Sequence, residues 1–181
     1  MKLLMTITGK DQPGIIAAFT GAIFKCGGNL EDANMTILEG EFAMILLAEI
    51  GSASGYRKFV ASIERIKKTL ALSIQIRPIK RRLTRGEKHL KGSVPYILSV
   101  YGRDHAGIVY QVSKVLADEG LNITDLNSNI AGSGKNSIYA LILEVDAPQN
   151  ARIRTVEKKI DQIKKKLKVD VSFKPLETAR L

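Results

Sequence analysis

The sequence predicts an α+β protein made of two copies of one domain, each with the element order βαββαβ. Shifting the chain by 93 positions aligns residues 9–37 with residues 102–130 without a gap, and nine of these 29 positions are identical. Each copy also shows the same succession of short apolar runs and helical periodicities. Between the copies lies a basic stretch, residues 79–92, which carries half of the net charge of +10. A repeat of this length indicates a duplicated domain.

The first strand and the first helix of each copy follow directly from apolar spacing. Residues 3–8 and 96–101 are apolar runs of strand length. The next segment of each copy carries apolar residues at i, i+4, i+7 and i+8, which lie on one face of a helix. These residues are Ile15, Phe19, Ala22 and Ile23, and Ile108, Val112, Val115 and Leu116. Gly27 and Gly120 follow, where a glycine commonly ends a helix.

The second half of each copy predicts a hairpin, a helix and a last strand, which gives a four-stranded antiparallel sheet with two helices on one face. The predicted hairpin strands are residues 29–37 with 42–50, and 122–130 with 137–145. Their turns fall at Glu39–Gly40 and at residues 132–134. The predicted second helices and last strands are residues 59–70 and 72–76, and 156–167 and 169–173.

Composition and charge set the class of protein. The chain is 45% hydrophobic and 25% charged, which is globular. Its single cysteine, Cys26, excludes an internal disulfide. It has no apolar run of about 20 residues, and its start lacks the pattern of a signal peptide. We therefore expect a cytoplasmic protein that does not contact membranes, divided into domain 1 (1–78), linker (79–92), domain 2 (93–176) and tail (177–181).

Nucleic acid is an alternative partner, because the basic side chains of the linker can contact phosphates. These side chains are Lys80, Arg81, Arg82, Arg85, Lys88 and Lys91. RNA-binding modules with the same element order stack bases on aromatic residues of the central strands. The corresponding strands here, 42–47 and 138–143, are mainly aliphatic. Nucleic-acid binding is therefore secondary, and rests on the linker.

The loop between the first strand and the first helix is the best candidate for a binding site. Gly14 and Gly107 stand where the helix begins, so no side chain blocks its first N–H groups, which can bind an anion. Asp11 and Asp104 precede the helix and are expected to cap it. The structural alternative is a capped helix that binds nothing.

Asn29 and Asn122 open the second strand of each copy. We expect them beside the first loop, where the amide would complete a polar pocket. The structural alternative is an asparagine that adopts the left-handed conformation in the helix-to-strand turn.

The pattern Gly-x-Asp-x-(Pro)-Gly-Ile, followed some fifteen residues later by Gly-x-Asn, resembles the ACT domain family, whose fold is ferredoxin-like. Tandem copies without an attached enzyme resemble the glycine-cleavage-system transcriptional repressor group. The resemblance implies that a small amino acid, such as glycine or serine, binds where two ACT domains meet. It assigns the ligand's polar groups to Asp11 with Asn29 and to Asp104 with Asn122. The full expected set is Asp11, Gln12, Pro13, Gly14, Ile15, Asn29, Asp104, His105, Ala106, Gly107, Ile108 and Asn122.

The expected function is regulation rather than catalysis, because the sequence has no catalytic cluster, metal-ligand spacing or cofactor motif. A bound amino acid would change the packing of the domains and thereby a surface read by a regulated protein, either a transcription factor or an enzyme. Open strand edges predict a homo-oligomer, such as a dimer. Ala106 stands where the family has proline, so the copies are expected to differ in ligand or in activity. A ligand-free interaction scaffold is the remaining alternative.

Overall fold

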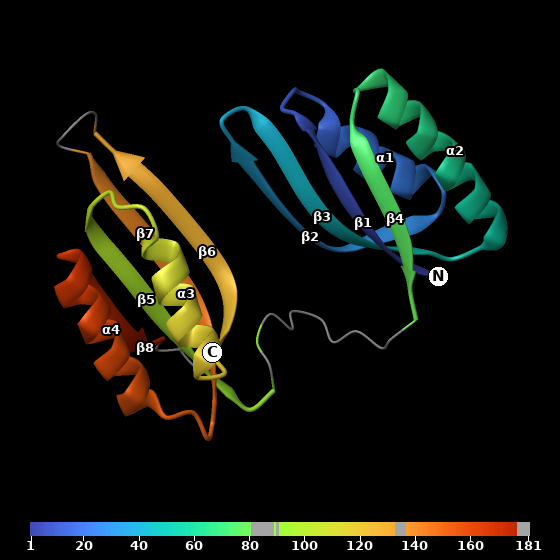
Figure 1. Ribbon diagram of the computed structural model, residues 1–181. Helices are drawn as coiled ribbons and strands as arrows, with labels where there is room; N and C mark the ends of the chain where they lie inside the picture. The colour runs from blue at the N-terminus through green and yellow to red at the C-terminus, as the bar shows by residue number, and fades with distance from the viewer. Residues whose placement is uncertain (81–88, 90, 133–136, 177–181) are drawn as a thin grey trace. The chain divides into compact units, whose positions relative to one another are not determined.

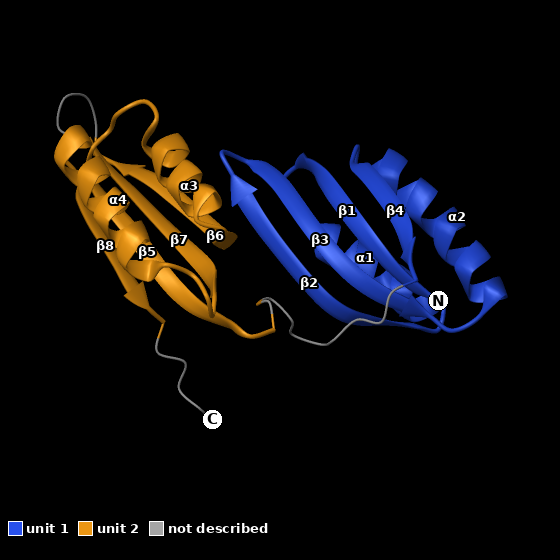
Figure 2. Ribbon diagram, turned by 60° about the horizontal axis from the view of Figure 1, so that its bottom comes forward, with its two compact units in different colours: residues 1–86 blue, residues 87–181 orange. Residues whose placement is uncertain are grey.

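The chain folds into two compact units, Met1–Gly86 and Glu87–Leu181 (Figures 1 and 2). The computed structural model describes residues 1–80, 89, 91–132 and 137–176. The expected tail at 177–181, most of the linker and residues 133 and 134 of the second hairpin turn lie outside the described residues. Each unit is described by itself.

Unit 1 has the predicted βαββαβ order, and its four strands form one antiparallel sheet in the order β2-β3-β1-β4 (Figure 1). Glu39 and Gly40, both with positive φ, form the tight turn between β2 and β3. The elements are β1 (Lys2–Lys10), α1 (Ile15–Lys25), β2 (Gly28–Leu38), β3 (Glu41–Ile50), α2 (Ala53–Thr69) and β4 (Ser73–Ile79).

Unit 2 repeats this arrangement, with strand order β6-β7-β5-β8, so the predicted fold class is confirmed. The strands of both units extend beyond most of the predicted ranges. Apolar residues mark only the buried part of a strand, whereas strand pairing continues into polar ends such as Arg103. The elements are β5 (Ser93–Arg103), α3 (Ile108–Asp118), β6 (Asn122–Ala131), β7 (Ile138–Pro148), α4 (Ile153–Leu167) and β8 (Asp170–Pro175).

Each unit has its own core, between its sheet and its two helices. In unit 1 alternate residues of β1 point into this core and are fully buried, and Phe19 of α1 and Phe59 of α2 pack against them. The other face of the sheet is open to solvent, and Ile45 on that face is 45% exposed. The helices therefore cover one face of the sheet only. None of the helices in the described ranges is both long and apolar enough to cross a membrane.

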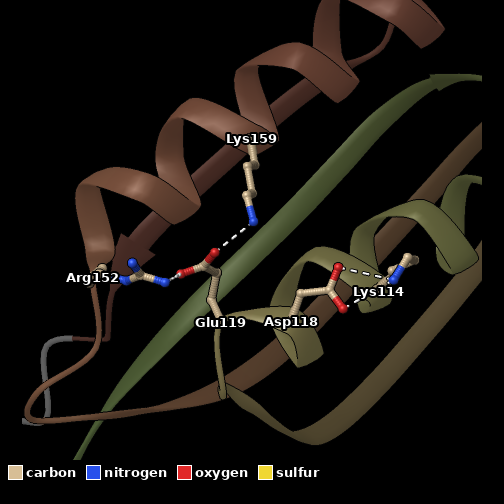
Figure 3. Close-up of polar contacts among 5 residues, drawn as sticks. All are labelled: Lys114, Asp118, Glu119, Arg152 and Lys159. Atoms are coloured by element: carbon tan, nitrogen blue, oxygen red, sulfur yellow. Dashed lines mark hydrogen bonds and ion pairs between the residues drawn. The ribbon is translucent and has the colours of Figure 1, made fainter.

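An ion-pair cluster joins the end of α3 to α4 in unit 2 (Figure 3). The side chain of Glu119 is only 3% exposed, and its carboxylate accepts hydrogen bonds from Lys159 Nζ at 2.6 Å and Arg152 Nη2 at 3.3 Å. The hydrogen bond from Lys159 and the charges of both cations hold the pKa of Glu119 below its usual value. The neighbouring pair, Lys114 with Asp118 at 3.0 Å, lies on the exposed face of α3. Glu119 thus fastens the C-terminal end of α3 to its neighbour.

Candidate functional site

The loop between β1 and α1 crosses the end of the sheet of unit 1. Lys10, the last residue of β1, pairs with Glu41, and the next backbone N–H, that of Asp11, donates to the carbonyl oxygen of Gly40 at 2.8 Å. The chain then turns at Pro13 and Gly14, and α1 begins. Asp11, Pro13 and Gly14 are exposed, so this end of the unit presents a short polar loop to solvent.

Glycine is required at the start of both helices because of backbone conformation. Gly14 and Gly107 are the N-cap residues of α1 and α3, with φ of 96° and 91°, in the left-handed region. A Cβ built on Gly14 would meet no atom within 4 Å, so crowding does not explain the residue. The positive φ, rather than a lack of space, therefore explains the glycine.

The expectation that Asp11 and Asp104 cap the helices was wrong. The N-cap positions are occupied by Gly14 and Gly107, and neither helix has a side-chain cap. Each aspartate lies three residues earlier, because the turn at residues 13–14 or 106–107 intervenes. Both aspartates are exposed.

The uncapped helix starts give this loop its electrostatic character. The N–H groups of a first helical turn have no acceptor within the helix, and the helix dipole adds positive potential there. A carboxylate fits such a position, as other anions do. The exposed carboxylates of Asp11 and Asp104 add a negative charge to each loop. A loop with a positive and a negative end suits a zwitterion.

The remaining loop residues differ between the copies. Gln12 is half-buried, and its Nε2 donates to the carbonyl oxygen of Leu70 at the end of α2 at 2.9 Å. His105, at the equivalent position, is exposed, as is Ala106. Gln12 thus holds the loop of unit 1 to the rest of the fold.

Ile15 and Ile108 belong to the cores. Each side chain is only 2% exposed and anchors the start of its helix. A ligand at the loop could therefore contact these residues only through their backbone. The N–H of Ile108 already lies 3.4 Å from the carbonyl oxygen of His105, a long hydrogen bond.

Neither Asn29 nor Asn122 lies beside the loop of its own unit, so that expectation was wrong. Asn29 pairs with Glu49 of β3, at the end of the sheet where β1 begins, whereas the loop follows the other end of β1. The cause is α1, whose 11 residues carry the chain back by roughly 16 Å before β2 starts. Asn122 pairs with Asp146 in the same way. Neither asparagine is in the left-handed conformation, so the structural alternative was wrong too.

Asn122 does line a surface groove of unit 2. The groove has a volume of 400 Å³ and runs beside α3, whose Tyr110 and Lys114 form its wall. Asn122 lies in this groove at the opposite end of α3 from Asp104.

The proposed phosphate contacts of the linker are only partly described. Lys80 and Lys91 are exposed at the two ends of the linker. The other four members of the set, Arg81, Arg82, Arg85 and Lys88, lie outside the described residues.

Sequence reasoning missed one polar cluster, in which a linker histidine lies on β7. His89 Nδ1 is 2.7 Å from Asp146 Oδ1, and its Nε2 is 3.2 Å from Glu144 Oε1. Asp146 is fully buried. Part of the signal was present, because Glu144 lies between apolar residues of the predicted strand 137–145, and Asp146 follows that strand directly. Their partner is 57 residues away in the sequence, and no local pattern points to it.

The family is decided by comparison with known proteins. Two ACT domain profiles match the chain, one over residues 1–83 and one over residues 96–168. The chain belongs to the ACT domain family. It holds two ACT domains in tandem, as the resemblance in the sequence predicted. Both profiles are those of ACT domains, which are regulatory modules that bind amino acids and oligomerise, and no catalytic family is indicated.

Relatives match one domain or both. A "UPF0237 protein" of Streptococcus pneumoniae is 30% identical over 76 residues, which are 42% of this chain and 86% of the relative. A crystal structure of an unknown protein from Galdieria sulphuraria superimposes with a TM-score of 0.79 at 24% identity, covering 97% of this chain and 98% of that one. The structure of a "putative glycine cleavage system transcriptional repressor" gives a TM-score of 0.66 at 16% identity, with 98% of both chains covered. These two structural likenesses show the tandem fold.

Proposed function

We propose that this tandem ACT protein senses a small amino acid and transmits its presence to a protein partner. The observation that carries the proposal is that both copies present the same exposed loop, with an uncapped helix start and an aspartate three residues before it. A purely structural turn needs the glycine but has no use for an exposed carboxylate at a fixed distance from it.

The two ends of a free amino acid fit the two ends of each loop. The ligand carboxylate accepts hydrogen bonds from the first-turn N–H groups of α1 or α3. The ammonium group pairs with Asp11 in one copy and Asp104 in the other. Main-chain recognition of the carboxylate does not depend on the ligand's side chain, so specificity must come from groups around the loop.

A second ACT domain completes the proposed site. Asn29 and Asn122 lie at the far end of their own sheets, so neither can reach the loop of its own unit. An asparagine from another ACT domain in the assembly has no such restriction. Glycine and serine are the first candidates for the ligand, because the resemblance in the sequence implies a small amino acid and the fold is shared with a protein described as a "putative glycine cleavage system transcriptional repressor".

Regulation follows from a ligand shared between domains. An amino acid held by two ACT domains binds best when they are in contact, and it shifts the population toward that assembly. The shift is limited by the difference in its affinity for the two states. The partner, a transcription factor or a metabolic enzyme, would recognise a surface that only one assembly displays.

The test is calorimetric titration of the full chain with the twenty common amino acids, glycine and serine first. Asp11→Ala and Asp104→Ala should each lower the amino-acid affinity of one class of sites by about tenfold or more, since each removes a charge-assisted hydrogen bond. Asn29→Ala and Asn122→Ala should weaken binding as well. Asp161→Ala, which removes an exposed carboxylate from α4, is the matched control and should bind normally. Silence toward all twenty amino acids in the folded protein would overturn the proposal.

Nucleic-acid binding through the linker is the second candidate, favoured by the exposure of Lys80 and Lys91 at its ends and by its share of the net charge. Such contact would be electrostatic and independent of sequence. It would add to amino-acid sensing rather than replace it, because it uses different residues.

A further inference from the structure

The helix-free face of the sheet of unit 1, called here the open face, is apolar at its centre. Its residues alternate with the core residues of β1 and β3. Leu4 and Leu47 are half-buried and Ile45 is 45% exposed. They form the floor of a depression with a volume of 600 Å³, which reaches from Asp32 and Asn34 on β2 to β4 and Lys80. An apolar hollow of this kind marks an interaction surface.

Charges divide the open face into two halves. The strand order places β2 and β3 on one side and β1 and β4 on the other. The acidic side chains all come from β2 and β3, and they are Glu31, Asp32, Glu41 and Glu49. The basic side chains come from β1, from β4 and from the residue after β4, and they are Lys2, Lys10, Arg77 and Lys80. Lys2 is bonded to Glu31 within the chain at 2.8 Å, across the line that separates the halves.

One register row crosses the whole open face and contains both charges and the apolar centre. Asp32 pairs with Leu47, Leu47 pairs with Leu4, and Leu4 pairs with Arg77. Asp32 and Arg77 are both exposed, and they stand at opposite ends of the row. Three strand spacings, about 14 Å, separate them, so they cannot pair with each other in one chain.

We propose that the open face of unit 1 is the contact between two copies of this chain, stacked face to face about a two-fold axis parallel to the strands. Such an axis reverses the strand order, so β2 of one copy lies over β4 of the other and β3 lies over β1. Asp32 then faces Arg77 of the second copy, and Leu47 faces its Leu4. The contact is isologous and contains each pair twice.

Charge selects this axis over the alternative one. A two-fold axis perpendicular to the strands would also stack the faces, but it would place β2 over β2 and β4 over β4. Acidic side chains would then face acidic ones, and like charges brought together across an interface are strongly unfavourable. Only the parallel axis lays the acidic half of one face on the basic half of the other.

The dimensions of the face fit a specific contact. Four strands, each about seven to nine paired residues long, cover roughly 20 Å by 25 Å. Two such faces bury on the order of 1,000 Å², the lower size of specific interfaces, at the spacing of about 10 Å usual for stacked sheets. In unit 2 the equivalent face carries His89 on Glu144 and Asp146, so part of it is already covered. The bare face is the one in unit 1.

The test is a mixing experiment on the full chain, followed by sedimentation equilibrium. The wild-type chain should be a dimer. Asp32→Arg sets two arginines against each other across the contact, and Arg77→Asp sets two aspartates against each other. Each variant alone should therefore dissociate with a Kd raised at least about tenfold. Mixed in equal amounts, the two variants should form a heterodimer, because both of its contacts then join an arginine to an aspartate.

An unfolded variant could not form the heterodimer, so dimerisation of the mixture shows that loss of folding does not explain the behaviour of the single variants. The test also needs no amino acid, so it is independent of the proposed ligand. Glu64→Arg, a charge reversal on the exposed surface of α2, is the matched control and should leave the dimer intact. A monomeric wild-type chain would overturn the proposal. So would single variants that remain dimers, or a mixture in which both variants stay monomeric although circular dichroism shows each of them folded.

Discussion

Glu119, at the end of α3, and Lys159, in the middle of α4, are joined by a hydrogen bond of 2.6 Å from Lys159 Nζ to a carboxylate that is almost fully shielded from solvent (Figure 3). Arg152 binds the second oxygen of the same carboxylate. Because α3 begins at one of the candidate loops, this contact fixes the far end of the helix on which that loop depends. Its strength is governed by the charge state of Glu119.

Replacing Glu119 with Gln should lower the stability of unit 2 more at neutral pH than in acid. The pKa of Glu119 is lowered in the folded state, so its stabilising contribution is complete above its unfolded value near 4.5 and is lost as the pH falls through the folded pKa. Urea unfolding at pH 7 and at pH 3 measures both conditions. Glu157→Gln, on the exposed face of α4, should leave the midpoint unchanged at either pH. Equal effects of Glu119→Gln at both pH values would contradict an ionic contribution.

Replacing Gly14 or Gly107 with Ala should destabilise its unit by about 1–2 kcal/mol, the cost of a left-handed conformation for a residue with a Cβ. No clash adds to the cost at Gly14, because the new methyl group would meet open space. Gly21, in the interior of α1, is the control, since its substitution by Ala should stabilise the helix by about 0.5–1 kcal/mol. Urea denaturation monitored by circular dichroism measures all three, and the same sign at Gly14 and Gly21 would show that the conformational argument fails.

Gln12→Ala should destabilise unit 1 by roughly 1 kcal/mol, because the carbonyl oxygen of Leu70 loses its side-chain donor. His105→Ala, at the equivalent position of unit 2, should change stability by less than about 0.5 kcal/mol, since the imidazole is exposed. Equilibrium unfolding distinguishes the two. An equally large effect at His105 would mean that its imidazole also supports the fold.

Phe59→Ala should destabilise unit 1 by about 3–5 kcal/mol, because it removes a buried ring and leaves a cavity in the core. Because unit 2 has a core of its own, we expect its amide signals in a two-dimensional NMR spectrum to persist while those of unit 1 broaden or vanish. Phe24→Ala is the matched control, because that ring is 80% exposed. Simultaneous loss of signals from both units would contradict separate cores.

Replacing Arg81, Arg82 and Arg85 with Gln should weaken binding to a polyanion such as heparin or single-stranded DNA. On a nucleic acid, the slope of log K against log salt should become shallower by about 0.7–0.9 for each phosphate that the variant no longer neutralises. Fluorescence anisotropy over a salt series measures the slope. Amino-acid titration of the same variant should match the wild type, and a parallel loss of amino-acid binding would refute separate roles for linker and loops.

The fold could be predicted from the sequence because its determinants are local or repeated. Apolar runs of strand length placed β1 and β5, and helical spacing placed Phe19 and Phe59 in the core. The duplication then supplied every element twice. The ends of the strands were missed, because hydrogen bonding continues there into polar residues. The starts of the second helices were missed as well, since α2 begins at Ala53 and α4 at Ile153, before the predicted residues 59 and 156.

The candidate site was predicted only in part, because its geometry depends on register. The turn at Gly14 is local, and its glycine was visible in the sequence. Whether Asn29 reaches that turn depends on which end of β3 it pairs with, and no local pattern encodes this. The contact between Gln12 and Leu70 joins residues 58 positions apart, so no local pattern predicts it either. The prediction that Asp11 caps α1 was wrong for a local reason, because the intervening turn makes Gly14 the N-cap.

The contact of Gln12 with Leu70 has a kinetic consequence. In unit 1 the loop cannot open without breaking the bond from Gln12 to the end of α2, whereas His105, at the equivalent position of unit 2, is exposed. Local opening costs less where fewer contacts must break. Amide hydrogens at the start of α3 should accordingly exchange with solvent faster than those at the start of α1, so twin modules with one chemistry would respond to the same signal on two different timescales.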